Sequence, residues 1–598
     1  MSARYALYVG RPRTARSDNT ATISGAGCKR VFETDRIVGL VRNVRAVPLA
    51  SGPGVLIGDV HHRRGPPTPV TEIDAQTEAA LIDGKLDLLI SSYWGSYVGA
   101  VDTPDGLIVF RDPSGTRACY FAETTDAVIF ASDVRTLIEI GHFDPPIDWD
   151  GVTQYLYSSA MPSATTALGN ISELLPGTSV KVHEKRRDIR SIWSPWDHAS
   201  TRSMCSVAQN AAALHEITHN CVAALTHGMS RPLISVSGGL DSSIVAACIA
   251  RSNKMPVGLT MFTDDRAGDE RYYASILCEA LGFELISCKY LVQDIAIDSP
   301  VSPHLPRPIG RTLASAYENA LVQHAMQRHA DGFATGNGGD NVFANLRSAK
   351  CIIDRLMAER WSGAIWSTFR DVAAVTGTSF WETGRAALKA YRQRADPYRW
   401  KPNTRFLHPD LIAHLADRPL EHEWLQGPDT ALPGERVHIA GILRVQQTLE
   451  PPRITHAPVI TPLIAQPVME LCLSIPTWQW CTGGRDRAVA RLAFQADLPT
   501  EIIDRRVKGT PDSFTAQIIT HYRDDIRDRL LDGELAQRGL LDRACLESVL
   551  SQDSIARAED RPRLLDLLDT EAWISHWLGV AGTETGRSRS AALRSPSQ

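Results

Sequence analysis

A turn rich in glycine and hydroxyl side chains at 237–243 follows an apolar run at 233–236 and precedes apolar residues in a helical pattern at 244–250. Such a strand–turn–helix junction directs backbone N–H groups and the positive end of the helix dipole at one point, which suits a phosphate group. A carboxylate repels a phosphate unless a metal ion lies between them, so Asp241 is predicted to bind Mg²⁺. The predicted phosphate-binding residues of this turn are Ser237, Gly238, Gly239, Asp241, Ser242 and Ser243.

The residue order in this turn narrows the kind of phosphate site. The turn has neither the G-x-x-x-x-G-K-[ST] spacing of a Walker loop nor the G-x-S-x-G elbow of a serine hydrolase. Ser237-Gly-Gly-Leu-Asp-Ser242 resembles the S-G-G-x-D-S pyrophosphate-binding loop of ATP pyrophosphatases that form AMP, a group that includes the asparagine synthetases. This resemblance implies ATP and Mg²⁺ as cofactors. For the turn taken alone, a Ser/Gly-rich turn that merely opens a helix is the alternative.

A second glycine-rich stretch lies at 331–343, where a short predicted strand ends in Gly336-Asn-Gly-Gly339 and Asp340 begins the next helix. This run of glycines indicates a tight backbone path beside a ligand. The stretch resembles the S-G-x-G-x-D-E-V-F segment of asparagine synthetases. That resemblance implies that Asp340 binds Mg²⁺ together with Asp241 and that Gly336 lies at the ATP site. For the stretch alone, an Asn/Gly-rich turn with a helix-capping Asp340 is the alternative.

A third series of segments follows near the C-terminus. The segments at 462–476, 486–494 and 505–509 resemble, in order, an apolar helix, a basic helix and an R-x-K-x-G segment of asparagine synthetases. By this resemblance Lys508 matches the lysine that stabilises the charged intermediates in the related β-lactam synthetase, and it is the predicted catalytic residue. An ordinary solvated lysine is the alternative. Ala465 stands where the family has an aspartate, which weakens the match in the amine-activating part of the site.

These motifs need a framework that brings the ends of strands together. The order of a strand at 233–236, a helix and a second strand at 256–262 indicates a parallel, doubly wound sheet, which binds ligands at the carboxyl ends of its strands. Thr260 and Met261 would lie at such an end, where they either hold the adenine of ATP or belong to the core. The predicted α/β ATP pyrophosphatase domain, with helical insertions, spans 206–582 and opens with an amphipathic helix from about 207 to 225.

Residues 1–205 form a predicted β-rich α+β domain, because short apolar runs alternate with turn signals. The segments 110–115 (F-R-D-P-S-G), 130–133 (F-A-S-D) and 174–177 (L-L-P-G) resemble, in order, the class II, Ntn-type glutaminase domain of asparagine synthetases, a β-sandwich. That glutaminase uses the cysteine next to the initiator methionine, whereas this chain has Ser2 there. Serine is a poor nucleophile without an organised base. We therefore expect a degenerate domain that keeps its shape and has lost its ammonia-producing chemistry.

The composition is that of an ordinary enzyme: 598 residues, 43% hydrophobic and 22% charged, enough for two to four domains. A net charge of -5 argues against nucleic-acid or membrane-surface binding. No stretch approaches the ~20 apolar residues of a spanning helix. The N-terminus lacks a signal-peptide core, so the expected compartment is the cytoplasm.

Other residues suggest less chemistry. The 11 cysteines form no C-x-x-C pair and no His/Cys cluster at zinc spacing, and we expect free thiols. His61 and His62 are expected in a solvated loop. Residues 350–450 carry no motif, and their aromatic side chains, among them Trp361 and Trp381, are expected in a helical core, with the wall of a peptide pocket as the alternative. The Ser/Arg/Ala-rich segment 583–598 is expected to be a disordered tail.

The resemblance implies a reaction in which a carboxylate attacks the α-phosphorus of ATP, pyrophosphate leaves and an amine captures the acyl-adenylate. Three residues before Asp340, β-lactam synthetases have a tyrosine and asparagine synthetases a glutamate, whereas this chain has Asn337. Residues 336–343 look most like lasso peptide cyclases, which join the N-terminal amine of a core peptide to an Asp or Glu side chain. This similarity predicts a precursor peptide as substrate and a leader peptidase and a leader-binding protein as partners.

Other functions stay open at this point. They are a β-lactam synthetase-like or other amide-forming enzyme with a small substrate, and a non-catalytic scaffold that binds peptide or nucleotide. A tRNA-modifying ATP pyrophosphatase is disfavoured by the acidic balance of the chain.

Overall fold

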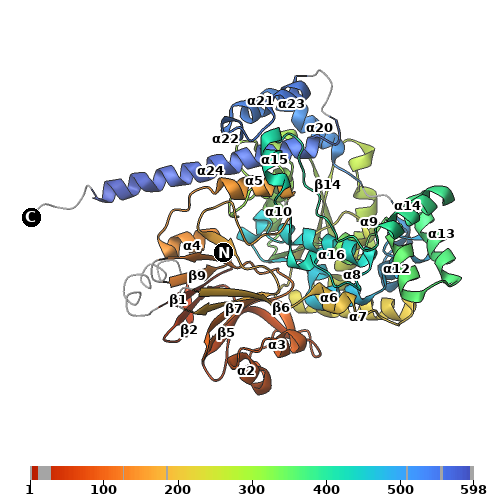
Figure 1. The fold of residues 1–598 in the computed structure, drawn as a ribbon, viewed down its shortest axis with the longest axis horizontal. Coiled ribbons are helices and arrows are strands. Elements are labelled where there is room, and N and C mark those ends of the chain that lie inside the picture. The colour runs from red at the N-terminus through yellow and green to blue at the C-terminus, as the bar shows by residue number, and fades with distance from the viewer. Residues whose placement is uncertain are drawn as a thin grey trace, which may run out of the picture.

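A computed structural model describes residues 3–10, 28–124, 127–159, 161–183, 186–252, 254–506, 509–551 and 557–592. The N-terminal part is a β-sandwich, and the rest of the chain surrounds a parallel sheet (Figure 1). Among the helices of these ranges, none combines the length and the apolar character that crossing a bilayer requires.

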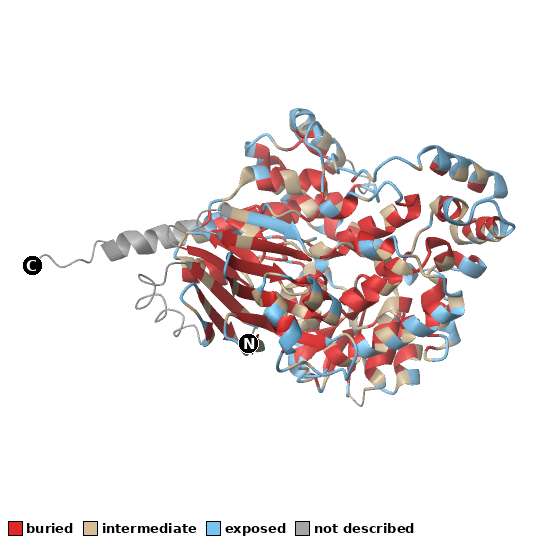
Figure 2. Cartoon of the chain, turned by 60° about the horizontal axis from the view of Figure 1, so that its bottom comes forward, coloured by how far each residue is buried: buried red, intermediate tan, exposed pale blue. Residues whose placement is uncertain are grey.

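The sandwich has two six-stranded sheets whose paired strands all run antiparallel. One sheet has the order β10 (Ile171–Glu173), β8 (Tyr120–Glu123), β9 (Ala127–Ala131), β1 (Arg4–Gly10), β3 (Ile37–Arg42) and β2 (Lys29–Glu33). The other has the order β12 (Arg186–Ser191), β11 (Thr178–His183), β7 (Gly106–Arg111), β6 (Tyr93–Thr103), β5 (Gly54–His62) and β4 (Ala46–Pro48). These strands confirm the predicted β-rich domain, and Figure 2 shows them largely buried.

Alternating side chains of the two sheets meet in one core, as the period of a strand requires, with Leu7 of β1 and Val109 of β7 among them. Helices α2 (Ala75–Ile82) and α3 (Asp87–Ser92) cover the outer face of the second sheet. Helices α4 (Val134–Gly141) and α5 (Trp149–Ser158) cover the outer face of the first. The domain therefore has four layers, helix–sheet–sheet–helix.

The part of the chain after the sandwich is built on a five-stranded sheet. Its strand order is β15 (Glu284–Lys289), β14 (Val257–Phe262), β13 (Pro232–Ser235), β16 (Gly332–Ala334) and β17 (Val459–Ile460). All of its neighbouring strands pair in parallel, which confirms the predicted parallel sheet. The chain adds β14 and β15 on one side of β13 and then crosses to add β16 on the other. Such a reversal opens a crevice between the ends of β13 and β16, where α/β sheets of this kind bind ligands.

Helices pack on both faces of this sheet. On one face lie α7 (Val207–Leu225), α8 (Leu240–Ala250) and α9 (Arg271–Leu281). On the other lies α10 (Ala314–Gln327), whose Leu321 packs on Leu233 of β13. The next residue of β13, Ile234, belongs to the first face. The amphipathic helix predicted near 207–225 is α7.

The remaining helices of the described ranges are α6 (Pro195–Ala199), α11 (Gly339–Val342), α12 (Lys350–Glu359), α13 (Ala364–Thr376), α14 (Phe380–Arg392), α15 (Pro409–Ala416), α16 (Pro433–Val445), α17 (Gln466–Ser474), α18 (Ala488–Ala493), α19 (Thr500–Asp504), α20 (Asp512–His521), α21 (Arg523–Asp532), α22 (Glu534–Gln537), α23 (Arg543–Leu550) and α24 (Arg561–Ala592). Helix α24 passes through the first part of the predicted tail, since adding residues to an existing helix costs little once it is nucleated. Residues 593–598 lie outside the described residues.

The helices α12–α14 form a lobe at the right of Figure 1. The prediction of a helical core is wrong for part of this lobe, because Trp361 and Trp381 are 81% and 79% exposed. Helix α13 buries only one stripe, including Phe369, against its neighbours, so aromatic residues off that stripe face solvent.

The structure tests two further expectations, on the cysteines and on His61 and His62. All 11 cysteines are free thiols, as predicted. The solvated loop predicted at 61–62 is wrong: both residues continue strand β5, and His61 is 1% exposed and stacked on Trp94. Near the end of the first predicted domain, Trp193 and Trp196 are buried, and their indoles donate to Glu470 Oε1 and to the Trp424 carbonyl (both 2.9 Å).

Candidate active site

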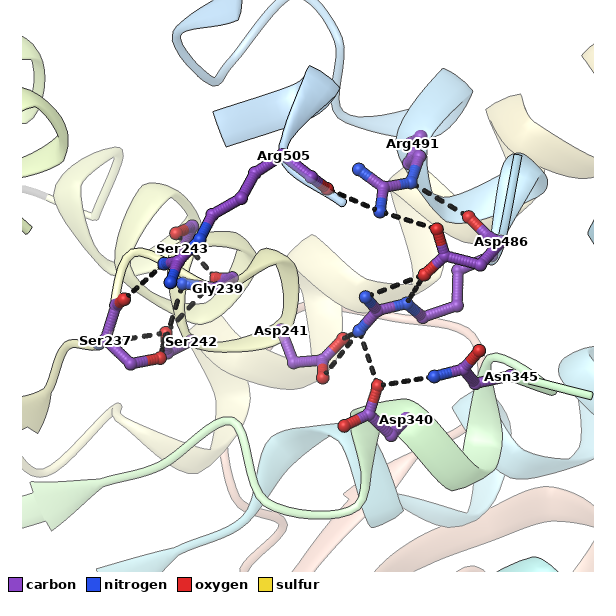
Figure 3. Close-up of polar contacts among 11 residues, drawn as sticks. Ser237, Gly239, Asp241, Ser242, Ser243, Asp340, Asn345, Asp486, Arg491 and Arg505 are labelled. Carbon is purple, nitrogen blue, oxygen red and sulfur yellow. Dashed lines mark hydrogen bonds and ion pairs between the residues drawn. The ribbon is translucent and has the colours of Figure 1, made fainter. Parts of the chain in front are cut away.

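The predicted phosphate loop lies between the end of β13 and the start of α8 (Figure 3). Gly238 has φ +59°, and a Cβ there would lie 2.3 Å from Cβ of Tyr273, so conformation and space both require glycine. The Ser237 hydroxyl lies 3.3 Å from the Ser242 hydroxyl and accepts from Gly239 N–H at 3.3 Å. Both hydroxyls are partly exposed and are placed to bind a phosphate at the N-terminus of α8.

Three other residues of the predicted ATP site have more internal positions. The Ser243 side chain is fully buried and donates to the Gly239 carbonyl (2.8 Å), so in this structure its hydroxyl holds the loop together. Thr260 is buried near the end of β14, and Met261 beside it is partly exposed. Contact of Thr260 and Met261 with adenine stays a prediction.

The second glycine-rich stretch packs directly against the first. A Cβ on Gly336 would lie 2.4 Å from the backbone nitrogen of Ser242, and one on Gly339 would lie 2.4 Å from Cγ of Asp241. The two loops approach this closely only because neither glycine carries a side chain. As a result, Asp340 at the start of α11 faces the phosphate loop.

An arginine that the sequence analysis overlooked joins the two predicted Mg²⁺ ligands. Arg487 Nη1 donates to both carboxylate oxygens of Asp241 (3.1 Å each) and to Oδ1 of Asp340 (2.6 Å). Arg487 also pairs with Asp486, its neighbour in the chain. Burial lowers the pKa of Arg487, but the carboxylates of Asp241, Asp340 and Asp486 outweigh it and raise that pKa overall. The sequence contained one signal for Arg487: it lies within 486–494, a segment that resembles the basic helix of asparagine synthetases.

The donor set formed by Asp241 and Asp340 fits a hard divalent cation. Two carboxylates from separate loops already share a single positive group, and oxygen ligands are what Mg²⁺ prefers. An ion that took the place of the Arg487 nitrogen would have both carboxylates as ligands. When bound, Mg²⁺ would supply positive charge to neutralise departing pyrophosphate. This assignment of Asp241 and Asp340 stays a prediction.

The predicted catalytic Lys508 lies outside the described residues, but the chain on both sides of it is anchored beside the phosphate loop. Arg505, also overlooked, donates to the Ser237 carbonyl (2.7 Å) and to Oε1 of Glu270 (2.6 Å). Gly509 N–H donates to the same Glu270 oxygen at 3.1 Å. Glu270 therefore holds Arg505 and Gly509 beside the loop where the pyrophosphate is predicted to bind.

A cavity of about 220 Å³ lies beside the Arg487 network, between the end of α13 and the segment 484–506. Its lining includes Asp486, the partner of Arg487, and Arg491, which pairs with Asp486 (2.9 Å). The lining residues Arg347 and Arg506 are exposed. Positive charge at the rim favours anionic groups.

Comparison with known proteins decides the family. Residues 213–578, more than half of the chain, match the family model described as asparagine synthase. The chain belongs to the asparagine synthase family. Residues 90–193 match the model of a glutamine amidotransferase domain. This chain is 19% identical to "Asparagine synthetase [glutamine-hydrolyzing] 1" of Bacillus subtilis over 484 residues, which cover 74% of this chain and 73% of that protein.

Two solved structures are more distantly similar to this asparagine synthase family member. One is the glutamine phosphoribosylpyrophosphate amidotransferase of B. subtilis with ADP and GMP (11% identity, TM-score 0.21, 56% of this chain and 90% of that one). The other is described as the allosteric regulatory enzyme of purine biosynthesis (11% identity, TM-score 0.22, 56% and 89%). The family matches confirm the resemblance to asparagine synthetases and make the protein an ATP-dependent, amide-forming ligase with an N-terminal domain of the glutamine amidotransferase type.

Proposed function

We propose that this ligase closes the macrolactam ring of a ribosomally made lasso peptide. The side-chain carboxylate of an Asp or Glu in the peptide attacks the α-phosphorus of ATP and releases pyrophosphate. The N-terminal amine of the same peptide then attacks the acyl-adenylate, forms the isopeptide bond and releases AMP and a proton.

The observation that carries this proposal is Asn337. It lies three residues before Asp340, and its side-chain amide donates to the Thr448 hydroxyl (2.8 Å) and carbonyl (3.3 Å). A carboxamide does not accept a proton from an amine near neutral pH, so this position supplies no general base. A primary α-amine, with a pKa near ~8, is substantially neutral in the cell and needs none. The site therefore suits a peptide N-terminus better than a sluggish secondary amine.

The N-terminal sequence supports the same source for the amine. Ser2 stands where the glutaminase of asparagine synthetases has its nucleophilic cysteine, and a serine hydroxyl without an organised base is a poor nucleophile. Position 2 lies outside the described residues, so this argument rests on the sequence. An amine carried by the substrate removes the need for ammonia, and catalysis then depends on holding two ends of one molecule together.

The α12–α14 lobe, which lines part of the cavity, carries exposed aromatic side chains. The end of α13 lines the cavity, and the α12–α14 lobe exposes Trp361, Trp366, Phe380 and Trp381. Trp366 and Phe380 stack on each other (ring centroids 6.3 Å apart, planes at 9°). Exposed aromatic side chains that gather on one lobe are typical of a binding surface rather than of free solvent contact. We propose that they hold the core peptide while its carboxylate enters the site.

Mass spectrometry tests the reaction. The purified protein, with MgATP and a leader-free core peptide that has an Asp or Glu several residues from its N-terminus, should convert the peptide to a product about 18 mass units lighter, by condensation. AMP should form in equal amount, and Asp241→Asn should abolish both products. Formation of AMP without a lighter peptide would support the adenylation step and contradict the proposal that the peptide's N-terminal amine is the nucleophile. No AMP, even with a leader peptidase and a leader-binding protein added as the proposed partners, would favour a non-catalytic scaffold.

A further inference from the structure

Two histidines of α7 and an aspartate from a distant part of the sequence converge in space. His215 and His219 lie one turn apart on this helix, so their side chains leave the same face. Asp497 lies between α18 and α19, far away in sequence. His215 Nε2 is 2.7 Å and His219 Nε2 3.6 Å from Oδ2 of Asp497, and the three potential ligand atoms lie within 4.8 Å of one another.

The Asp497 carboxylate divides its two oxygens between different partners. Oδ1 forms an ion pair with Arg251, the residue that ends α8, while Oδ2 faces the two imidazoles. His219 Nε2 is buried and has no hydrogen-bond partner among the described residues. A buried ring nitrogen without a partner costs free energy, and this one points at an oxygen that is just too far away for a hydrogen bond.

We propose that His215, His219 and Asp497 bind a Zn²⁺ ion. Two imidazole nitrogens and one carboxylate oxygen are a common three-ligand zinc set, with a water molecule as fourth ligand, and nitrogen ligands favour Zn²⁺ over Mg²⁺. The His215 side chain is 31% exposed, which leaves room for that water. Zinc would replace the His215–Asp497 hydrogen bond and give His219 a partner. Arg251 would act as the outer partner that orients the ligating carboxylate.

The position of this site gives zinc a structural role. The ion would tie α7 and, through Arg251, the end of α8 to the segment after α18. That segment leads back along the chain to Arg487 and forward to Arg505, both of which contact the phosphate loop. Phe494 packs against both imidazoles and closes one side of the cluster (ring centroids 5.2 and 5.8 Å). Zinc should therefore raise the thermal stability of the whole protein.

Zinc titration of the full-length protein tests this site separately from the ligase reaction. Protein freed of metal with EDTA and returned to magnesium-containing buffer should bind one equivalent of zinc in calorimetry and melt at a higher temperature. His219→Ala removes a nitrogen that makes no hydrogen bond, so this variant should fold. Its zinc affinity should fall more than about tenfold. Loss of a residue that only hydrogen-bonds to a metal ligand already lowers metal affinity by about that factor, and His219 is a proposed ligand itself.

Two further variants serve as matched controls. His227→Ala removes an exposed histidine just beyond the end of α7 and should bind zinc like the wild type. Asp241→Asn should also keep the zinc equivalent, because its carboxylate belongs to the ATP site. Equal zinc affinity in the wild type and His219→Ala, loss of zinc in Asp241→Asn, or no binding at micromolar zinc would overturn the proposal. A visible absorption band of tetrahedral Co²⁺ that His219→Ala removes would support it.

Discussion

Asp241 and Asp340 accept hydrogen bonds from the same nitrogen of Arg487, at 3.1 and 2.6 Å, although they lie in the first turns of different helices, α8 and α11. Two buried or half-buried carboxylates at such close range need a shared cation. In this structure the cation is a guanidinium, and a bound metal would take over the same role. We therefore expect the site to respond both to loss of a carboxylate and to loss of Arg487.

Removal of one carboxylate should stop adenylation without unfolding the protein. We expect Asp340→Asn to lower the rate of AMP formation at least about 100-fold, the usual effect of losing one preorganised electrostatic group. The Asp340 side chain is 44% exposed, so the thermal midpoint of the variant should stay close to that of the wild type. The control is Asp410→Asn, whose side chain is 93% exposed on α15. Unchanged AMP formation in Asp340→Asn would contradict the predicted metal site.

Removal of the competing cation should have the opposite effect on metal affinity. In Arg487→Gln the two carboxylates lose their partner, so without nucleotide Mg²⁺ should bind at least about tenfold more tightly, a change of ~1.4 kcal/mol. Calorimetric titration measures this directly. Arg485→Gln, which removes an exposed ion pair with Asp504, is the control. Equal or weaker Mg²⁺ affinity in Arg487→Gln would show that Arg487 does not stand in for the metal.

The close approach of the two loops can be tested with one methyl group. In Gly336→Ala the new Cβ would lie 2.4 Å from backbone nitrogen of Ser242, so the loops must separate. A displacement of about 1 Å is enough to lower activity ~100-fold. Gly228→Ala is the control, since no atom lies within 4 Å of its Cβ position. Wild-type rates of pyrophosphate release in Gly336→Ala would mean that the loop spacing is not needed.

Stability should depend on pH through Asp569 on α24. Burial, with a smaller contribution from the Asp566 charge, raises the pKa of Asp569 to about 7, even though Val301 N–H donates to Oδ1 (2.7 Å) and opposes the shift. Because the folded-state pKa lies above the unfolded value near ~3.9, this group stabilises the fold at low pH, and that stability is lost as the pH rises through 7. Asp569→Asn should therefore have a free energy of unfolding about 1–3 kcal/mol higher than that of the wild type at pH 8, and so a higher melting temperature, with a smaller difference at pH 5. Melting curves that differ equally at the two pH values would contradict the assignment.

The exposed aromatic surface should affect peptide binding alone. We expect Trp381→Ser to raise KM for the core peptide about tenfold or more, because large aromatic contacts of this kind contribute ~1.5 kcal/mol or more at interfaces. AMP formation with saturating peptide and the thermal midpoint should change little. Met204→Ser, at a side chain 97% exposed outside the lobe, is the control. An unchanged KM in Trp381→Ser would remove this lobe from the proposed peptide site.

Much of the fold could be predicted because local patterns specify it. The apolar run at 233–236, the glycines after it and the helix pattern at 244–250 predict a strand, a turn and a helix from short-range preferences alone. Strand–helix–strand order then predicts a parallel sheet, and the structure has one. Prediction failed where burial depends on distant neighbours. Strand β5 continues through His61 because it pairs with β6, and Trp361 is exposed because no other described part of the chain packs over it.

The sequence by itself determined which loops approach the predicted ligand and which carboxylates they carry, because glycine and aspartate at fixed spacing restrict the backbone locally. Only the tertiary structure decided which side chains meet across the chain. Arg487 joins Asp241 from 246 residues away, and Asp497 meets His215 from 282 residues away. Such contacts are set by how α7, α8 and α18 pack on one another, and no spacing within a single segment encodes them.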